Sequence, residues 1–142
     1  MSRLGKLARL PPRDWLLLTE ATLLLAFSSA AVRLLTFTRV ARKLGAFMKE
    51  SPAGDERAAI VEARRIRWAV FAAARRIPWK PLCLPQAIAA MVMLRRRAIA
   101  GTLYLGVDRR NGFEAHAWVR VGPVIVTGGG AHTTYVVVSS FA

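Results

Sequence analysis

The sequence predicts an α+β domain in which N-terminal helices are followed by an antiparallel sheet. Apolar residues recur at helical spacing in the first two thirds of the chain, and from Ile99 onward apolar and polar residues alternate as they do in strands. With 142 residues, of which 54% are hydrophobic, the chain has enough length and apolar content to form one hydrophobic core. Helices that precede strands in this order favour the α+β class.

Residues 1–50 form a predicted helical segment. Asp14 follows two prolines and is the predicted N-cap of a helix through the run WLLLTEATLLLAFSSAAVRLLTF. Glu20 and Arg33 interrupt this run and leave 12 uncharged residues between them, fewer than the roughly 20 that a bilayer span requires. We therefore expect a buried helix or an interfacial one. The next run, RVARKLGAFM, mixes basic and apolar positions, so docking on a membrane surface or on a partner protein stays open.

Two further helices are predicted after the clearest break in the chain. That break is KESPAGDE, residues 49–56, which we interpret as a linker or an interhelical loop. The next helix, at about residues 56–75, is ended by Pro78. Its apolar positions recur at three- and four-residue spacing: Ile60, Ala63, Ile66 or Arg67, Val70 and Ala74. The last helix is predicted from about Leu82 to Arg96, with Cys83 in its first turn.

Four strands are predicted in the rest of the chain. IAGTLYLGV forms the first, and RRNG, with its Asn-Gly pair, forms a turn. FEAHAWVRV and VIVTGG alternate as two strands that meet near Gly122 and Pro123, and TTYVVVSSF is the last strand. We expect the helix that carries the cysteine to pack on the sheet that carries His116.

The chain is strongly basic. Lysine and arginine total 22 against eight acidic residues, which gives a net charge of +14. A chain with this net positive charge attracts nucleic acid, anionic lipid or an acidic peptide. The charge alone does not indicate which of these is the partner. The arginines lie in short groups with no helix-turn-helix, RNP or zinc-finger pattern between them. We therefore expect solvated helix faces or an acidic protein or peptide partner, and no nucleic acid.

Cysteine and histidine are scarce. One cysteine excludes an internal disulfide framework, and two histidines with few acids leave too few clustered ligands for a tetrahedral metal site. We expect neither a metal nor another cofactor. The lone cysteine fits a reducing cytoplasm, and no typical cleavage site of a signal peptide follows the early apolar run. The expected location is therefore cytoplasmic, peripheral to the membrane if the N-terminal helices dock there.

Cys83 and His116 are the candidate catalytic pair. A helix N-terminus favours the nucleophilic thiolate, because its unpaired N–H groups and positive dipole end point at the sulfur. The same N–H groups could hold the oxyanion formed at an acyl carbon, and Pro85 suits the first turn. His116 would accept the thiol proton and return it to the leaving amine. Taken separately, a lone cysteine is usually a small buried residue and a lone histidine a structural one, so the argument depends on both.

The run PWKPLCLPQAIAAMVMLRRRAIAGTLYLGV, followed by FEAHAWVRV and a Gly-rich strand end, resembles the transglutaminase-like leader peptidase family of lasso peptide biosynthesis. The similarity covers roughly residues 78–130, and PPRDWLLLTEATLLLAFSSAAVRLLTF is similar to the leucine-rich N-terminal helix of the same proteins. HAW by itself occurs across the wider transglutaminase-like superfamily, whereas the combined pattern is specific. The resemblance implies a transglutaminase-like (papain-like) cysteine protease core in residues 55–142, forming one compact unit with residues 1–50.

The resemblance also implies a function and partners. Such a protein is a cysteine protease that cuts the leader from a ribosomally made precursor peptide, and an asparagine-synthetase-like cyclase then closes the macrolactam on the freed amine. Cys83 matches the nucleophile of the family and His116 the base. A small, separate leader-recognition protein commonly delivers the precursor, and we expect this chain to depend on one.

The chain departs from the family at the third catalytic position. The family has an orienting acid about a dozen residues after the histidine, where this chain reads VIVTGGG and places Thr127 or Gly128. Three outcomes are open: a backbone carbonyl or Thr127 orients His116, Asp108 reaches it from a neighbouring strand, or activity is weak or absent. We favour the first.

Four other residues are secondary candidates. Gln86 could donate to the oxyanion or solvate the helix start, whereas Trp79 and Trp118 are expected to be core residues or pocket walls. His132, after GGGA, is an alternative base in poorly fixed surroundings.

A non-enzymatic function is the alternative to the peptidase. In that case the chain is a basic adaptor whose N-terminal helices and arginines hold an acidic partner or a membrane surface, with Cys83 and His116 as core residues. Thiol alkylation would then leave the function intact, whereas raised salt would dissolve the complex.

Overall fold

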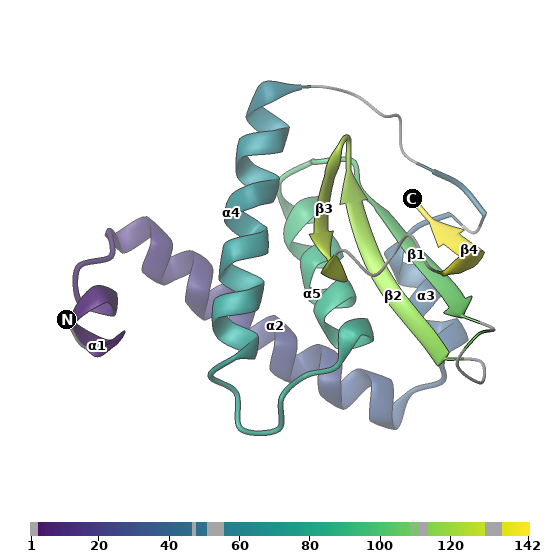
Figure 1. The fold of residues 1–142 in the computed structure, drawn as a ribbon, viewed down its shortest axis with the longest axis horizontal. Helices are drawn as coiled ribbons and strands as arrows, with labels where there is room; N and C mark the ends of the chain where they lie inside the picture. Colours follow the sequence, from purple (N-terminus) through teal and green to yellow (C-terminus); the bar gives the residue numbers. More distant parts are fainter. Residues whose placement is uncertain (1–2, 47, 51–55, 109, 111–113, 130–134) are drawn as a thin grey trace.

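The structure, a computed structural model, describes residues 3–46, 48–50, 56–108, 110, 114–129 and 135–142. Within these residues the helices come first along the chain and the strands follow, which confirms the predicted α+β class (Figure 1). The helices are α1 (Arg3–Leu7), α2 (Pro12–Leu34), α3 (Phe37–Leu44), α4 (Arg57–Ala74) and α5 (Cys83–Arg96). The strands are β1 (Thr102–Asp108), β2 (Glu114–Val121), β3 (Val124–Thr127) and β4 (Val136–Phe141).

Helix α2 begins at Pro12, because the fixed φ and missing N–H of proline suit the first helical position. The N-cap is Pro11, so the prediction that Asp14 caps the helix was wrong: the two prolines start the helix earlier. Asp14 lies in the first turn, where its carboxylate accepts a hydrogen bond of 2.9 Å from Arg65 of α4. The negative charge there also suits the positive end of the helix dipole.

The long helix α2 is packed on one side only. It is long and apolar enough to cross a membrane by length and composition alone, and 33% of its most apolar window is buried. Leu17, Leu18, Ala21 and Leu25 are buried where α2 packs against α4 and α5. The predicted buried helix is therefore confirmed for this face of α2, and the opposite face is exposed.

Helix α4 occupies almost the whole of its predicted range. Its buried face includes Ala63, Ile66, Val70 and Ala74, at the predicted spacing, and Arg67 is exposed. Of the two residues that the pattern left open, Ile66 is therefore the core residue. The Arg67 guanidinium lies against the Phe71 ring and donates a hydrogen bond of 2.9 Å to the backbone carbonyl of Ile125 on β3.

Helices α4 and α5 pack side by side on the sheet and α2 packs on both of them; α5 positions the cysteine. It contacts α2, α4 and β2, which confirms the expected packing of the cysteine helix on the strand that carries His116. Its buried residues combine alanines, which allow close approach, with Met91, Met93 and Leu94. Full burial of each large side chain contributes about 1.5–3 kcal/mol to folding. The cysteine helix is therefore held firmly against the domain.

The sheet is antiparallel, with strand order β3-β2-β1-β4. Gly122 and Pro123 form the predicted turn between β2 and β3, whereas the predicted Asn-Gly turn after β1 lies outside the described residues. Alternation along β2 directs Ala117 and Val119 into the core with the helices. His116 therefore projects from the face of the sheet opposite to the helices.

An ion-pair network joins the three long helices. Arg97, at the end of α5, donates to the Glu20 carboxylate of α2 at 2.6 Å and to Glu62 of α4 at 3.1 Å. All three side chains are largely shielded from water, so salt screens these pairs less than it screens typical surface pairs. The Glu20 and Glu62 carboxylates raise the pKa of the Arg97 guanidinium, chiefly through the Glu20 hydrogen bond.

Candidate active site

Cys83 is the first residue of α5, as the sequence predicts. Its thiol is free and half-buried, and the side chain packs against the edge of the helical core. Because α5 runs back to β1 through a short connection, its first residue lies at the end of the domain where β1 finishes and β2 begins. Figure 1 shows the start of β2 at this same end, and His116 is the third residue of that strand.

The start of α5 presents backbone donors next to the sulfur. The first turn of a helix has no carbonyl partners for its N–H groups. Pro85 has no N–H, and the N–H of Gln86 donates to the Leu82 carbonyl at 3.3 Å. This leaves the N–H groups of Cys83 and Leu84 as the donors at the helix start. Two adjacent N–H groups beside a sulfur are a suitable arrangement for binding an oxyanion.

The His116 ring is held by a backbone carbonyl. Its Nε2 lies 2.8 Å from the carbonyl oxygen of Gly128, which follows β3 directly. A carbonyl can only accept, so Nε2 carries the hydrogen and donates it. In the neutral ring the lone pair therefore lies on Nδ1. This bond falls at the position where the sequence lacks an acid, and it fixes both the tautomer and the plane of the ring.

Gly128 can take this position because it has no side chain. Its φ is +92°, in the region that favours glycine, and a Cβ added there would lie 2.3 Å from the Cβ of Trp118. The chain can therefore turn sharply after β3 and direct its carbonyl at His116 only with glycine at this residue.

Aromatic rings surround His116. Trp118 is buried and stacks on Tyr104 with ring centroids 5.4 Å apart, and its ring lies 6.0 Å from the imidazole. Tyr135, just before β4, lies closer, with 4.8 Å between its ring centroid and that of His116. Gly106 pairs with His116 across β1 and β2 and makes room for this cluster, because an added Cβ would lie 2.8 Å from the Trp118 ring. Trp118 is thus a buried residue beside His116.

The surroundings of Tyr135 raise the pKa of its phenol. Desolvation raises the pKa of the Tyr135 phenol, and the negative charges of Glu114, Asp108 and Cys83 raise it further. The sulfur is therefore within electrostatic reach of a phenol whose ring lies against His116. Within the described part of the chain, no hydrogen bond joins the Cys83 sulfur directly to the imidazole.

The two side chains considered as orienting groups do not bond to His116. Thr127 is fully buried, and its hydroxyl has no hydrogen-bond partner in the part of the chain that the structure describes. It pairs with Val119, on the helical side of the sheet. Asp108 is buried on β1, two residues beyond Gly106, and its carboxylate accepts a hydrogen bond of 2.9 Å from the backbone N–H of Arg110.

Gln86 and Trp79 have structural partners. The Gln86 amide donates a hydrogen bond of 2.8 Å to the Pro81 carbonyl and so holds the chain that enters α5. Trp79 is 47% exposed, and its indole N–H donates to the Ser29 hydroxyl of α2 at 3.2 Å. Gln86 was expected either to donate to the oxyanion or to solvate the helix start, and its hydrogen bond to the Pro81 carbonyl favours the role at the helix start. His132, the alternative base, lies outside the described residues.

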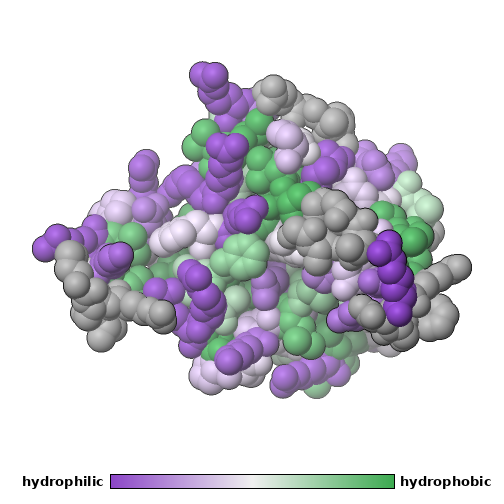
Figure 2. Space-filling view, viewed as in Figure 1, coloured by the Kyte–Doolittle hydropathy of each residue, from purple (hydrophilic) through white to green (hydrophobic). Residues whose placement is uncertain are grey.

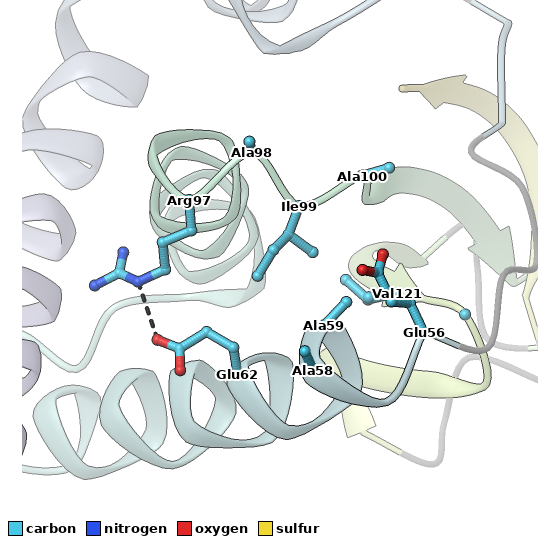
Figure 3. Close-up of a pocket in the computed structure, with 10 residues that line it drawn as sticks. Glu56, Ala58, Ala59, Glu62, Arg97, Ala98, Ile99, Ala100 and Val121 are labelled. Atoms are coloured by element: carbon cyan, nitrogen blue, oxygen red, sulfur yellow. Dashed lines mark hydrogen bonds and ion pairs between the residues drawn. The ribbon is translucent and has the colours of Figure 1, made fainter.

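A cleft of about 560 Å³ lies elsewhere in the domain. It is formed by the start of α4, the connection after α5 and the turn after β2, and Figure 3 shows Arg97 joined to Glu62 at one end of it. Since Cys83 begins α5 and Arg97 follows its end, about 20 Å of helix separates the cleft from the sulfur. Among the described residues, no cluster of three or more His, Cys, Asp or Glu side chains could hold a metal ion.

Sequence reasoning missed two residues of the cluster around His116. Tyr135 was included only in a predicted strand, and Gly106 only in another. The signal that could have found Gly106 is a glycine within an apolar strand, which often marks a close approach of another group. Tyr135 carried no local signal, because its contact with His116 depends on the pairing of β4 with β1.

Comparison with known proteins gives one match. A family model described as the transglutaminase-like superfamily matches residues 24–140, a range that includes both Cys83 and His116. No curated protein and no solved structure gives a significant match to the chain. The superfamily includes cysteine peptidases, and its model matches far more than half of the sequence. This protein therefore belongs to the transglutaminase-like superfamily.

Proposed function

We propose that this protein is a cysteine peptidase that removes the leader from a lasso peptide precursor. The observation that carries the proposal is the hydrogen bond from His116 Nε2 to the Gly128 carbonyl. It leaves Nδ1 as the basic nitrogen of a ring near the start of β2, the end of the sheet at which α5 begins with Cys83. Because the ring projects from the face opposite to α5, the proposal requires the thiol and the imidazole to meet around this end of the sheet. Membership of a superfamily that includes cysteine peptidases supports the same function.

The proposed reaction uses three groups. Nδ1 of His116 takes the proton of the Cys83 thiol, and the thiolate attacks the carbonyl carbon of the bond between leader and core. The N–H groups of Cys83 and Leu84 stabilise the resulting oxyanion. When the intermediate collapses, the C–N bond breaks and His116 returns its proton to the leaving amine of the core. Water, deprotonated by His116, then hydrolyses the thioester and releases the leader as a carboxylic acid.

A backbone carbonyl can replace the missing orienting acid in this mechanism. It accepts the Nε2 hydrogen and fixes the ring, which is the positional part of the acid's contribution. Unlike a carboxylate, it carries no full negative charge, so it stabilises the imidazolium less. We therefore expect a working but slower enzyme than one with an acid at this position.

The proposed partners follow from the resemblance to the leader peptidases. The substrate is a precursor peptide, a separate recognition protein presents its leader, and an asparagine-synthetase-like cyclase uses the freed amine. The strongly basic surface suits a precursor or partner with acidic residues. All of these would meet in the cytoplasm, where the single thiol stays reduced.

The test is cleavage of the cognate precursor by the purified chain with its recognition protein, followed by mass spectrometry. Wild type is expected to release leader and core, whereas Cys83→Ala is expected to release neither. His116→Ala should lose most of the rate, and iodoacetamide should inactivate wild type. Undiminished cleavage by Cys83→Ala would exclude the mechanism.

The approach of sulfur and imidazole is tested independently of the substrate. 1,3-Dibromoacetone alkylates a thiol and then a nearby nucleophile, so it should bridge Cys83 to His116 in one chain. Peptide mapping should find the bridge in wild type and only single alkylation of Cys83 in His116→Ala. If both proteins show only single alkylation, Cys83 and His116 lie too far apart to be bridged, and the proposal is contradicted.

A further inference from the structure

The exposed face of α2 carries a stripe of large apolar side chains. Leu16, Leu23, Phe27 and Leu34 are 73%, 66%, 72% and 82% exposed, and we refer to these four as the α2 stripe. At 100° per residue they fall within an arc of about 40°, and they extend over about 27 Å of helix. Scattered apolar residues are normal on a protein surface, whereas an aligned row of four marks an interaction site.

The contacts of the opposite face of α2 limit the orientation in which the α2 stripe can bind a partner. That face is buried against α4 and α5, Glu20 pairs with Arg97 at 2.6 Å, and Ser29 accepts the Trp79 indole hydrogen bond at 3.2 Å. For α2 to cross a bilayer, these contacts would have to break and Glu20 would enter hydrocarbon. The stripe is therefore suited to lying along a surface while α2 stays part of the domain.

Basic residues occur at both ends of the stripe. Arg13 lies in the first turn of α2 and Arg33 in its last turn, and both side chains are exposed. Before α2, Lys6 and Arg9 are also exposed. Long basic side chains can rest on an apolar surface while their charges reach phosphate groups. Figure 2 shows that hydrophilic side chains also surround the apolar patches on the face of the domain seen there.

We propose that the α2 stripe docks this protein on an anionic lipid surface, with α2 in the plane of the interface. The stripe enters the headgroup and acyl boundary, and the arginines bind lipid phosphates. Charge selects this occupant over a second copy of the chain, because two copies that each carry +14 repel one another. The proposal concerns where the protein acts, and it does not depend on the reaction at Cys83.

The test is sedimentation of the full chain with vesicles of phosphatidylcholine alone or with added phosphatidylglycerol. We expect binding to the phosphatidylglycerol vesicles, weaker binding in raised salt, and little binding to phosphatidylcholine alone. Leu23→Ser and Phe27→Ser should each weaken the partition coefficient by about tenfold, because each removes a large apolar side chain from the interface. Both positions are exposed, so the melting temperature should not change.

Matched controls separate this proposal from its competitors. Val61→Ser changes a 52% exposed apolar residue on α4, away from the stripe, and should bind like wild type. Cys83→Ala should also bind like wild type, so loss of peptidase function and loss of lipid binding are distinguishable. Equal binding to both vesicle types, binding that Leu23→Ser and Phe27→Ser leave unchanged, or absence of binding would each overturn the proposal. So would a dimer in light scattering that the same two substitutions dissociate.

Discussion

Gly128→Ala is the most informative single substitution in this protein. It adds one methyl group to the residue whose carbonyl accepts the His116 hydrogen bond. The alanine must adopt a φ of +92°, and its Cβ would lie 2.3 Å from the Cβ and 2.9 Å from the Cα of Trp118. Both atoms belong to the tightly packed strand β2, so the neighbour cannot easily move away.

The expected cost has two parts. Left-handed backbone costs about 1–2 kcal/mol for a residue with a side chain, and overpacking of a close contact costs about 1–3 kcal/mol. The sum, about 2–5 kcal/mol, corresponds to a fall in melting temperature of about 6–15 °C for a domain of this size. If the chain relieves the contact by moving the Gly128 carbonyl, His116 also loses a hydrogen bond of about 1.5 kcal/mol, and cleavage should slow about tenfold.

Gly129→Ala is the matched control. Gly129 also has a positive φ, +59°, but an added Cβ would meet no atom of the described residues within 4 Å. This variant should therefore lose only the conformational part, about 1 kcal/mol. Thermal unfolding followed by circular dichroism measures both variants, and the precursor cleavage assay measures the effect on His116. Equal melting temperatures for the two variants would refute the predicted contact with Trp118.

Three further predictions concern the interior of the domain and the surroundings of the site. Thr127→Val replaces a buried hydroxyl, which has no hydrogen-bond partner among the described residues, by a methyl group. It should therefore raise the free energy of unfolding by about 1 kcal/mol in urea titrations; slower cleavage by this variant would instead make Thr127 the orienting group. Arg97→Ala removes the guanidinium that Glu20 and Glu62 share, while Glu62 keeps its pair with Arg65 and Glu20 its pair with Arg96, so it should lower the free energy of unfolding by about 1 kcal/mol. An unchanged urea midpoint would contradict this value. In a Tyr104→Phe background, ultraviolet titration should give Tyr135 a pKa above the usual value of about 10, and Cys83→Ser should lower that pKa. The stability that neutral Tyr135 contributes is present below pH 10 and is lost as pH rises through its native pKa.

Local sequence determined most of the secondary structure. The ranges of α4 and α5, the strands and the turn at Gly122 and Pro123 follow from apolar periodicity and turn residues, which act over a few neighbours. The place of Cys83 at a helix start and that of His116 in a strand were predictable for the same reason. Asp14 was misassigned because Pro12, with its fixed φ, begins the helix before it.

Tertiary structure decided which groups surround His116 and which face of α2 stays exposed. The Gly128 carbonyl belongs to the backbone, so no side chain in the sequence reveals that it replaces an acid. Tyr135 reaches the imidazole only because β4 pairs with β1, a contact between residues far apart along the chain. Likewise, α2 carries large apolar side chains on its packed and on its exposed face, and only its packing on α4 and α5 determines which of them remain for a partner. Composition limits how much apolar surface a chain has, but contacts between distant residues decide which part of it is buried.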